Sequence, residues 1–153
     1  MCIRDRIWSE TIRNENILDY MFMPNIIVFS QKAWSKDPKW MSIQDQTERE
    51  ITLNYEWNKF TNSIGQRVLP IVENIYGGLT YDLPKPGGII KNDSLYANTA
   101  FPGLNIKYTL DGSLPNIESM NYNNPVEIDQ DDVIYLRLFD NKGRGGYPIQ
   151  VDK

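Results

Sequence analysis

Short alternating runs separated by turn residues dominate the second half of the chain. Apolar and polar residues that alternate have the two-residue period of a half-buried strand. Strands separated by turn signals every ~8–12 residues are typical of a small antiparallel sandwich. Such runs begin after Gly78, with Pro, Gly, Asn and Asp between them: Leu79–Leu83, Leu95–Asn98, Asn105–Leu110, Val126–Ile128, Val133–Phe139 and Tyr147–Val151. The sequence therefore predicts an antiparallel, immunoglobulin-like β-sandwich over residues 79–153.

Two turns in this region are specific enough to predict. Asp111-Gly112 follows the run Asn105–Leu110, and its glycine can supply the positive φ of a tight turn. Residues 140–146 are rich in glycine and could suggest a calcium or phosphate loop. They lack both the acidic ligands of a calcium loop and the Lys-Ser/Thr pair of a phosphate loop. We therefore predict a β-hairpin turn there.

The first half of the chain has helical periodicity. Asn14 and Asn16 are N-cap candidates for a helix that extends to Trp34 and that Pro24 interrupts. A second helix is predicted from about Ile43 to Ser63, with Gly65 as its C-cap. Its apolar stripe is formed by Leu53, Trp57, Phe60 and Ile64. A short third helix, 68–75, should close at Gly77-Gly78, and residues 84–88 then form a semi-rigid connection.

Composition narrows the functional classes. The 153 residues carry a net charge of −4 with both signs interspersed, which argues against a nucleic-acid binder that needs a basic face. No apolar run approaches the ~18–20 residues of a membrane span. Histidine is absent, which excludes imidazole catalysis and His metal sites within the chain. The single cysteine excludes an internal disulfide and a cysteine zinc cluster, so no metal or cofactor is expected.

Several segments together resemble one family. The segment Tyr-Thr-Leu-Asp-Gly-Ser-Leu-Pro at 108–115 resembles the C-terminal module of bacterial chitobiases and β-N-acetylhexosaminidases. Ile-Trp-Ser-Glu at 7–10 and Tyr-Met-Phe-Met-Pro-Asn at 20–25 resemble the end of the catalytic barrel in that family, glycoside hydrolase family 20. Further similar segments lie at 29–35, 57–70 and 81–87. The resemblance covers nearly all of residues 7–151, and the order and spacing of the segments are more specific than any one of them.

The resemblance implies an α+β fragment. Residues 7–78 would be the last strand and the following helices of a (β/α)8 barrel, and residues 79–153 the β-sandwich. Residues 1–6, Met-Cys-Ile-Arg-Asp-Arg, resemble a translated sequencing adapter, and they have no apolar core of a signal peptide. We expect the natural sequence to enter at about Ile7 from within a longer protein. The alternative is a native N-terminal tail.

Trp8 and Glu10 are the candidate substrate-binding residues. In (β/α)8 enzymes the active site lies at the C-terminal ends of the strands, and residues two apart on a strand point to the same face. By resemblance, Trp8 would form a wall of the −1 subsite, and Glu10 would hold the O4/O6 side of a terminal N-acetylhexosamine. Without the resemblance, a Trp beside a solvated Glu is the more common reading.

The family uses substrate-assisted catalysis, in which an Asp-Glu pair helps the substrate's own acetamido group attack the anomeric carbon. The resemblance implies that this pair belongs to an earlier strand of the barrel, which precedes the residues present in this chain. Asp45, Asp131 and Asp132 are not substitutes for it, because they lie in expected turns or on solvated faces. We therefore expect no catalytic residue and no hydrolase activity in the chain as given. Its expected partners are the rest of the barrel and, through the parent enzyme, an N-acetylhexosamine oligosaccharide.

Two questions stay open in the sequence. The family implies a periplasmic, outer-membrane-attached or secreted parent, but the sequence itself carries no address. An alternative function is a non-catalytic sandwich that binds glycan or braces a neighbouring domain. Exposed tyrosines could form a sugar-binding surface on it, although most candidates are expected in the core or on edge strands: Tyr96, Tyr108, Tyr122, Tyr135 and Tyr147.

Overall fold

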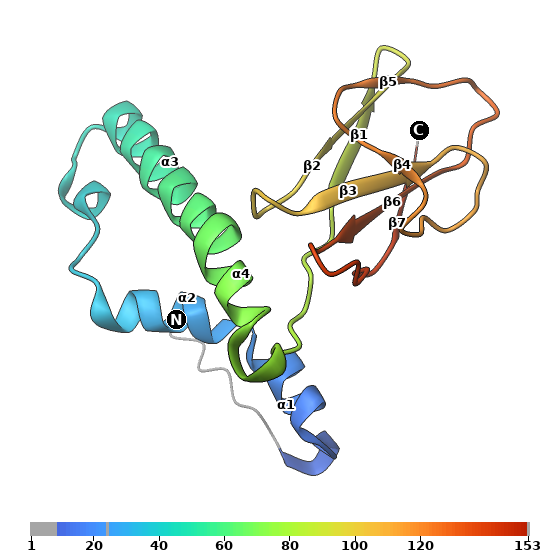
Figure 1. Ribbon diagram of the computed structural model, residues 1–153. Coiled ribbons are helices and arrows are strands. Elements are labelled where there is room, and N and C mark those ends of the chain that lie inside the picture. Colours follow the sequence, from blue (N-terminus) through green and yellow to red (C-terminus); the bar gives the residue numbers. More distant parts are fainter. Residues whose placement is uncertain (1–8, 24, 153) are drawn as a thin grey trace. The chain divides into compact units, whose positions relative to one another are not determined.

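The computed structural model describes residues 9–23 and 25–152, and Figure 1 labels their elements. The chain separates into two compact units. The helical unit comprises the residues up to Trp57 together with Ile71–Asp82. The sheet unit comprises Asn58–Pro70 together with the residues from Leu83 onward. The domain boundary that the sequence predicts between residues 78 and 79 separates evolutionary domains, which need not coincide with these compact units. That boundary stays a prediction.

The helical unit begins with the 3-10 helix η1 (Ser9–Thr11), followed by α1 (Glu15–Phe22) and α2 (Asn25–Trp34). Asn14 caps α1 as predicted, because its extended backbone lets Oδ1 accept the amide hydrogen of Ile17 at 2.9 Å. The predicted interruption of the helix falls between α1 and α2. Pro24, which was expected to cause it, lies outside the described residues.

The predicted second helix is α3 (Gln46–Ser63), which follows the 3-10 helix η2 (Lys39–Ser42). The prediction that Gly65 caps it is wrong. Helical backbone continues through the π-helical turn η3 (Ile64–Val68) into α4 (Leu69–Val72). Gly65 does not have the positive φ of a C-cap glycine, and a Cβ on it would collide with the backbone carbonyl of Pro102. The glycine is thus needed for a close approach of two backbones.

The helices end at the predicted glycines. The last helical element is η4 (Ile75–Gly77), in which Tyr76 and Gly77 have φ values of 51° and 87°. Gly78 follows with a φ of 99°, and a right-handed helix cannot accommodate such values. The strand predicted at 79–83 is wrong. These residues lie outside both sheets, and two of their amides donate elsewhere, Leu79 to the carbonyl of Val72 at 3.0 Å and Asp82 to that of Met23 at 3.2 Å.

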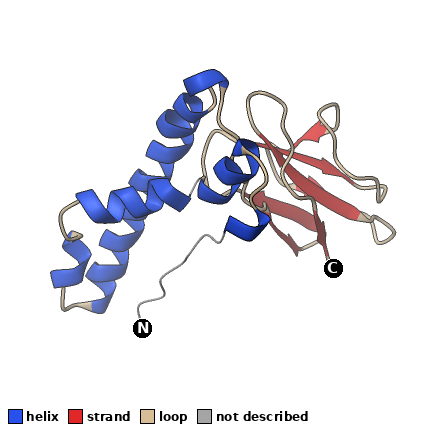
Figure 2. Ribbon diagram, turned by 90° about the horizontal axis from the view of Figure 1, so that it is seen from below, coloured by secondary structure: helices blue, strands red, loops and turns tan. Residues whose placement is uncertain are grey.

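The sheet unit contains two antiparallel sheets (Figures 1 and 2). Sheet A has the order β1-β2-β5, and sheet B has the order β4-β3-β6-β7. Their strands are β1 (Gly87–Lys91), β2 (Ser94–Asn98), β3 (Asn105–Thr109), β4 (Met120–Asn121), β5 (Val126–Glu127), β6 (Ile134–Phe139) and β7 (Ile149–Val151). Five of the predicted strands correspond to β2, β3, β5, β6 and β7, whereas β1 and β4 were not predicted.

The hydrophobic core of the sheet unit draws on both sheets. Leu95 of β2 is fully buried with the inward residues of β3, β6 and β7: Ile106, Tyr108, Ile134, Leu136, Leu138 and Val151. Every second residue of β6 is buried from Ile134 to Leu138, as the alternation predicted. The protein is therefore an α+β chain whose two antiparallel sheets share one core, as in a β-sandwich.

Candidate functional site

The predicted sugar-binding residues lie at the start of the described chain. Glu10 lies in η1, a 3-10 helix, and its side chain is exposed. Trp8 lies outside the described residues. Their pairing in one subsite therefore stays a prediction.

Two of the three aspartates that are poor substitutes for the catalytic pair, Asp45 and Asp132, have local structural roles. Oδ1 of Asp45 accepts the amide hydrogen of Glu48 at 2.8 Å at the start of α3. Oδ2 of Asp132 accepts that of Asp129 at 2.8 Å in the turn before β6. Each of these two carboxylates therefore stabilises the backbone next to it in the sequence.

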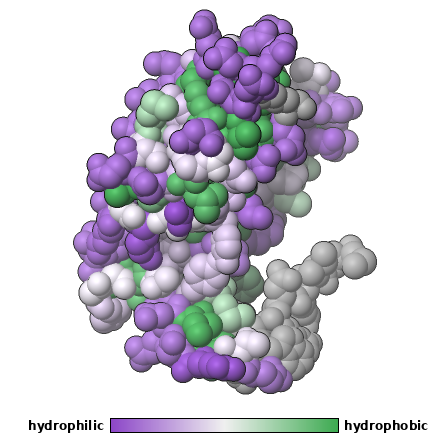
Figure 3. Space-filling model, turned by 90° about the vertical axis from the view of Figure 1, so that its right-hand side faces the viewer, coloured by the Kyte–Doolittle hydropathy of each residue, from purple (hydrophilic) through white to green (hydrophobic). Residues whose placement is uncertain are grey.

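The helical unit exposes an unusual amount of apolar surface. Within residues 10–23 and 25–60 no residue is buried. Trp34 exposes 89% of its surface, Phe29 68% and Trp57 55%. Amphipathic helices are normally stabilised by packing of their apolar side, so this exposed helical surface is suited to contact with further polypeptide. Figure 3 shows the side of the molecule on which the strands are drawn in Figure 1, and there hydrophobic side chains are scattered among hydrophilic ones.

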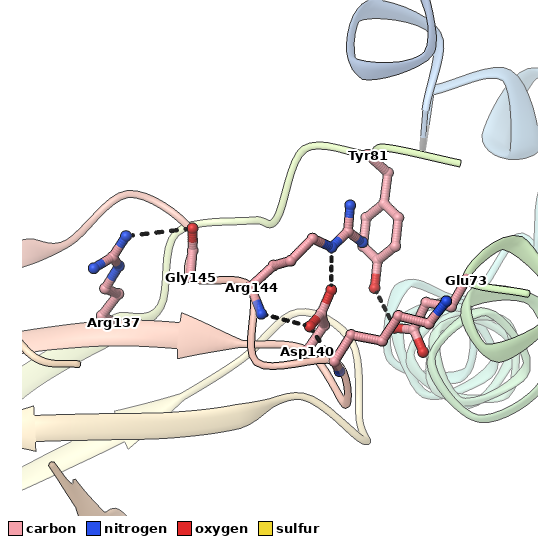
Figure 4. Close-up of polar contacts among 7 residues, drawn as sticks. Glu73, Tyr81, Arg137, Asp140, Arg144 and Gly145 are labelled. Carbon is pink, nitrogen blue, oxygen red and sulfur yellow. Dashed lines mark hydrogen bonds and ion pairs between the residues drawn. The ribbon is translucent and has the colours of Figure 1, made fainter. Parts of the chain in front are cut away.

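The loop between β6 and β7 is organised by a buried carboxylate. Asp140 exposes only 2% of its surface. Its Oδ1 accepts the amide hydrogens of Lys142 and Arg144 at 2.9 and 2.8 Å, and its Oδ2 accepts from Nε of Arg144 at 2.6 Å (Figure 4). Since β6 and β7 are antiparallel neighbours, the predicted hairpin turn is confirmed. In the described part of the chain, no group of three His, Cys, Asp or Glu side chains is placed to hold a metal ion.

Arg137, which lies on β6 of sheet B, forms hydrogen bonds with two loops. Its Nε donates to the carbonyl of Gly146 at 2.7 Å, while its other nitrogens donate to those of Pro115 and Gly145 at 3.3 and 3.4 Å. The guanidinium also lies 5.2 Å from the ring centroid of Phe139. Figure 4 shows Arg137 directed at the Gly145 carbonyl. These contacts assign Arg137 a structural role.

Asp111 forms the predicted tight turn. Gly112 has a φ of 78°, and Oδ1 of Asp111 accepts from the amide and the hydroxyl of Ser113 at 3.0 and 2.6 Å. These hydrogen bonds, that from the hydroxyl first, hold the pKa of the Asp111 carboxyl below its ordinary value. The hydrogen bonds favour the charged form, and the group is a turn anchor on the surface.

A buried pair in the helical unit was not predicted. Glu73 exposes 4% of its surface and Tyr81 also 4%. The Tyr81 hydroxyl donates to Oε1 of Glu73 at 2.7 Å (Figure 4). Little in the sequence indicates this pair, because an acidic residue in the predicted helix 68–75 would ordinarily be solvated.

The five tyrosines considered for a sugar-binding surface divide into two groups. Tyr108 is buried in the core, as expected, whereas Tyr122 and Tyr135 are half-buried. Tyr135 lies on an interior strand, β6, and faces away from the core residues Ile134 and Leu136. Tyr96 and Tyr147 are exposed. Only these two present enough ring surface for stacking on a ligand.

Comparison with known proteins places the chain in a family. Residues 73–146 match the chitobiase/β-hexosaminidase C-terminal domain. Over 116 residues the chain is 34% identical to the N,N'-diacetylchitobiase of Vibrio harveyi, and over 126 residues it is 32% identical to the β-hexosaminidase of Vibrio vulnificus. The chain belongs to the chitobiase/β-hexosaminidase family.

The similarity to this family covers most of the chain but little of the relatives. The two alignments include 70% and 72% of this chain, yet only 13% and 15% of the Vibrio proteins. The matched C-terminal domain extends from the Glu73 region through β6, and it includes the Asp111 turn. Among the described residues, no helix of this family member has the length and apolarity needed to cross a bilayer.

Proposed function

We propose that the chain is the C-terminal part of a β-N-acetylhexosaminidase that removes terminal N-acetylhexosamine from glycans or chitooligosaccharides. The observation that carries the proposal is the 34% identity to a diacetylchitobiase, together with the C-terminal domain match. A likeness of this extent, spread over 116 residues, involves both the helices and the sheets.

In the proposed enzyme, Trp8 and Glu10 bind the terminal sugar. The flat face of an indole covers the C–H face of a pyranose while leaving its hydroxyls free. A carboxylate beside it accepts hydrogen bonds from hydroxyls, each contributing about 1.5–3 kcal/mol. The exposure of the Glu10 side chain supports this role, because it leaves the carboxylate accessible to a ligand. The acetamido group of the substrate serves as nucleophile, as in other substrate-assisted glycosidases.

The apolar surface of the helical unit supports a second part of the proposal. In the longer protein the helices α1, α2 and α3 pack around the end of a (β/α)8 barrel, which covers side chains such as Phe29 and Trp34. The rest of that barrel is then the principal partner of residues 7–78, and the sandwich follows from residue 79.

Two assays test the proposal. The 153-residue chain should not release 4-nitrophenol from 4-nitrophenyl N-acetyl-β-D-glucosaminide, because it has no counterpart of the Asp-Glu pair. A longer protein that supplies the barrel should hydrolyse it, and Trp8→Ala and Glu10→Gln in that protein should each lower kcat/KM at least about tenfold. Unchanged kcat/KM in both variants would reject the assigned subsite, and activity of the 153-residue chain would reject the assigned division of labour.

A second candidate function is a sandwich that braces the helices. It is favoured by the membership of Asn58–Pro70 in the sheet unit and by the contact of Gly65 with the Pro102 carbonyl. If bracing is the main role, deleting residues 83–153 from the longer enzyme should lower its thermal stability while leaving KM unchanged.

A further inference from the structure

The outer surface of sheet A has a composition that differs from an ordinary solvated sheet. Leu95 faces the core, so its neighbours Ser94 and Tyr96 face outward, and the strand pairing extends this assignment to β1 and β5. We call this surface the sheet A face. It consists of Gly87, Ile89, Lys91, Ser94, Tyr96, Asn98 and Glu127.

An apolar pair occupies the centre of the sheet A face. Ile89 and Tyr96 are direct cross-strand partners and expose 63% and 41% of their surfaces. The Cβ atoms of such partners lie about 4.5–5.5 Å apart, so the two side chains form one continuous apolar surface. Nothing else in sheet A exposes an aromatic ring.

Hydrogen-bonding groups border this pair at both ends. Asn98 is two residues from Tyr96 on β2, which places it about 7 Å along the strand. Its side-chain amide lies over Gly87, where a Cβ would collide with Oδ1 of Asn98. At the other end, Ser94 is paired with Glu127 across the strands. The row Asn98, Tyr96 and Ser94 therefore places an aromatic ring between polar groups.

The size and charge of the sheet A face select its ligand. The exposed fractions of Ile89 and Tyr96 correspond to on the order of 200 Å² of mainly apolar surface, which is below the apolar share of the ~800 Å² that each partner contributes to a stable protein interface. Lys91 and Glu127 carry opposite charges, so the face has no net attraction for phosphate or nucleic acid. A neutral ligand with flat C–H faces and a rim of hydroxyls matches this arrangement.

We propose that the sheet A face binds an oligosaccharide, with Tyr96 and Ile89 beneath one pyranose ring and with Asn98, Ser94 and Glu127 hydrogen-bonded to its substituents. The choice of an N-acetylglucosamine oligomer rests on the proposed function of the longer protein. Binding at this face is independent of hydrolysis, so it holds or fails without the catalytic assignment.

The test is a titration of the isotope-labelled 153-residue chain with N,N',N''-triacetylchitotriose, followed by amide NMR shifts. The expected result is saturable shifts concentrated in β1 and β2. Tyr96→Ala should weaken binding by about tenfold or more, whereas Tyr96→Phe should retain most of it because the ring face remains. Tyr147→Ala is the matched control, since it removes a tyrosine outside sheet A that is more exposed than Tyr96, at 64% against 41%.

A further variant examines the polar border. The φ of Gly87 is not positive, so alanine fits its backbone, but the added Cβ displaces the Asn98 amide. Gly87→Ala should weaken binding by about threefold, the loss of one modest hydrogen bond. Thermal unfolding of each variant separates loss of binding from loss of fold.

Three results would overturn the inference. The first is an absence of saturable shifts at millimolar trisaccharide in the folded protein. The second is an equal loss of affinity in Tyr96→Ala and Tyr147→Ala. The third is a concentration-dependent dimer that Tyr96→Ala abolishes, which would make the face a contact between two copies. If the longer protein did not hydrolyse the substrate while the sheet A face still bound the trisaccharide, only the proposed enzymatic function would be rejected.

Discussion

At the scale of single residues, carboxylates that accept several hydrogen bonds organise individual turns of the chain. Asp140 is the clearest case, because its buried carboxylate accepts two amide hydrogens and one guanidinium hydrogen bond. Asp140→Ala leaves these donors without their acceptor and should lower the free energy of unfolding by about 2–3 kcal/mol. Chemical denaturation of the 153-residue chain measures this. The exposed Asp131→Ala should change it by less than about 0.5 kcal/mol, and an equal loss in both variants would contradict the role of Asp140.

Asp111 makes stability depend on pH at the same scale. Because its pKa is lower in the folded protein than the ordinary 3.8, its contribution is fully present above pH 3.8 and disappears as the pH falls through the folded value. Ser113→Ala removes the largest cause of the shift, so NMR titration of the Asp111 carboxyl carbon should give a higher pKa. The Asp111→Asn protein should lose less stability between pH 4 and pH 2 than the wild type. An unchanged pKa in Ser113→Ala would exclude the hydroxyl as the cause.

At the scale of elements, Gly65 allows the backbone of η3 to lie close to the backbone of Pro102, which belongs to a loop of the sheet unit. In an ordinary helix, Gly→Ala stabilises by about 0.5–1 kcal/mol. Here the new Cβ would collide with the carbonyl of Pro102, so Gly65→Ala should instead destabilise by about 1–3 kcal/mol. Denaturant unfolding measures the sign directly. Ser63→Ala, at an exposed position of α3, is the control and should have nearly no effect, while a stabilising Gly65→Ala would contradict the close approach.

Sequence periodicity predicted elements well where the burial pattern is local. Burial alternates along β6 from Ile134 to Leu138, and Asn14 caps α1 by accepting the amide hydrogen of Ile17, three residues away. The prediction from periodicity failed where an element depends on contacts with backbone that is distant in the sequence. Gly87-Gly88 begins β1 because it pairs with β2, although two glycines indicate a turn. Conversely, 79–83 alternates because side chains such as Tyr81 are buried, without any sheet partner.

The candidate site was predicted by a different route from the elements. Trp8 and Glu10 came from resemblance to a family, and no local pattern distinguishes them from an ordinary Trp and Glu. The sheet A face could be named only in part, since Tyr96 is one of five plausible tyrosines in the sequence. Its pairing with Ile89 and the position of Asn98 over Gly87 depend on strand register, which one sequence does not fix.

At the scale of the whole molecule, burial divides the chain unevenly. The sheet unit has a buried core, whereas residues 10–23 and 25–60 have no buried residue. Short helices without tertiary packing are marginal in water, so their amides should exchange quickly. Hydrogen exchange of the 153-residue chain should therefore show strong protection in β3 and β6 and little in α1 and α2. In a longer protein that supplies the proposed barrel, α1 and α2 should become protected while β3 and β6 change little. Equal protection of all four elements in the 153-residue chain would show that the helices need no further polypeptide, and the barrel proposal would lose its structural support.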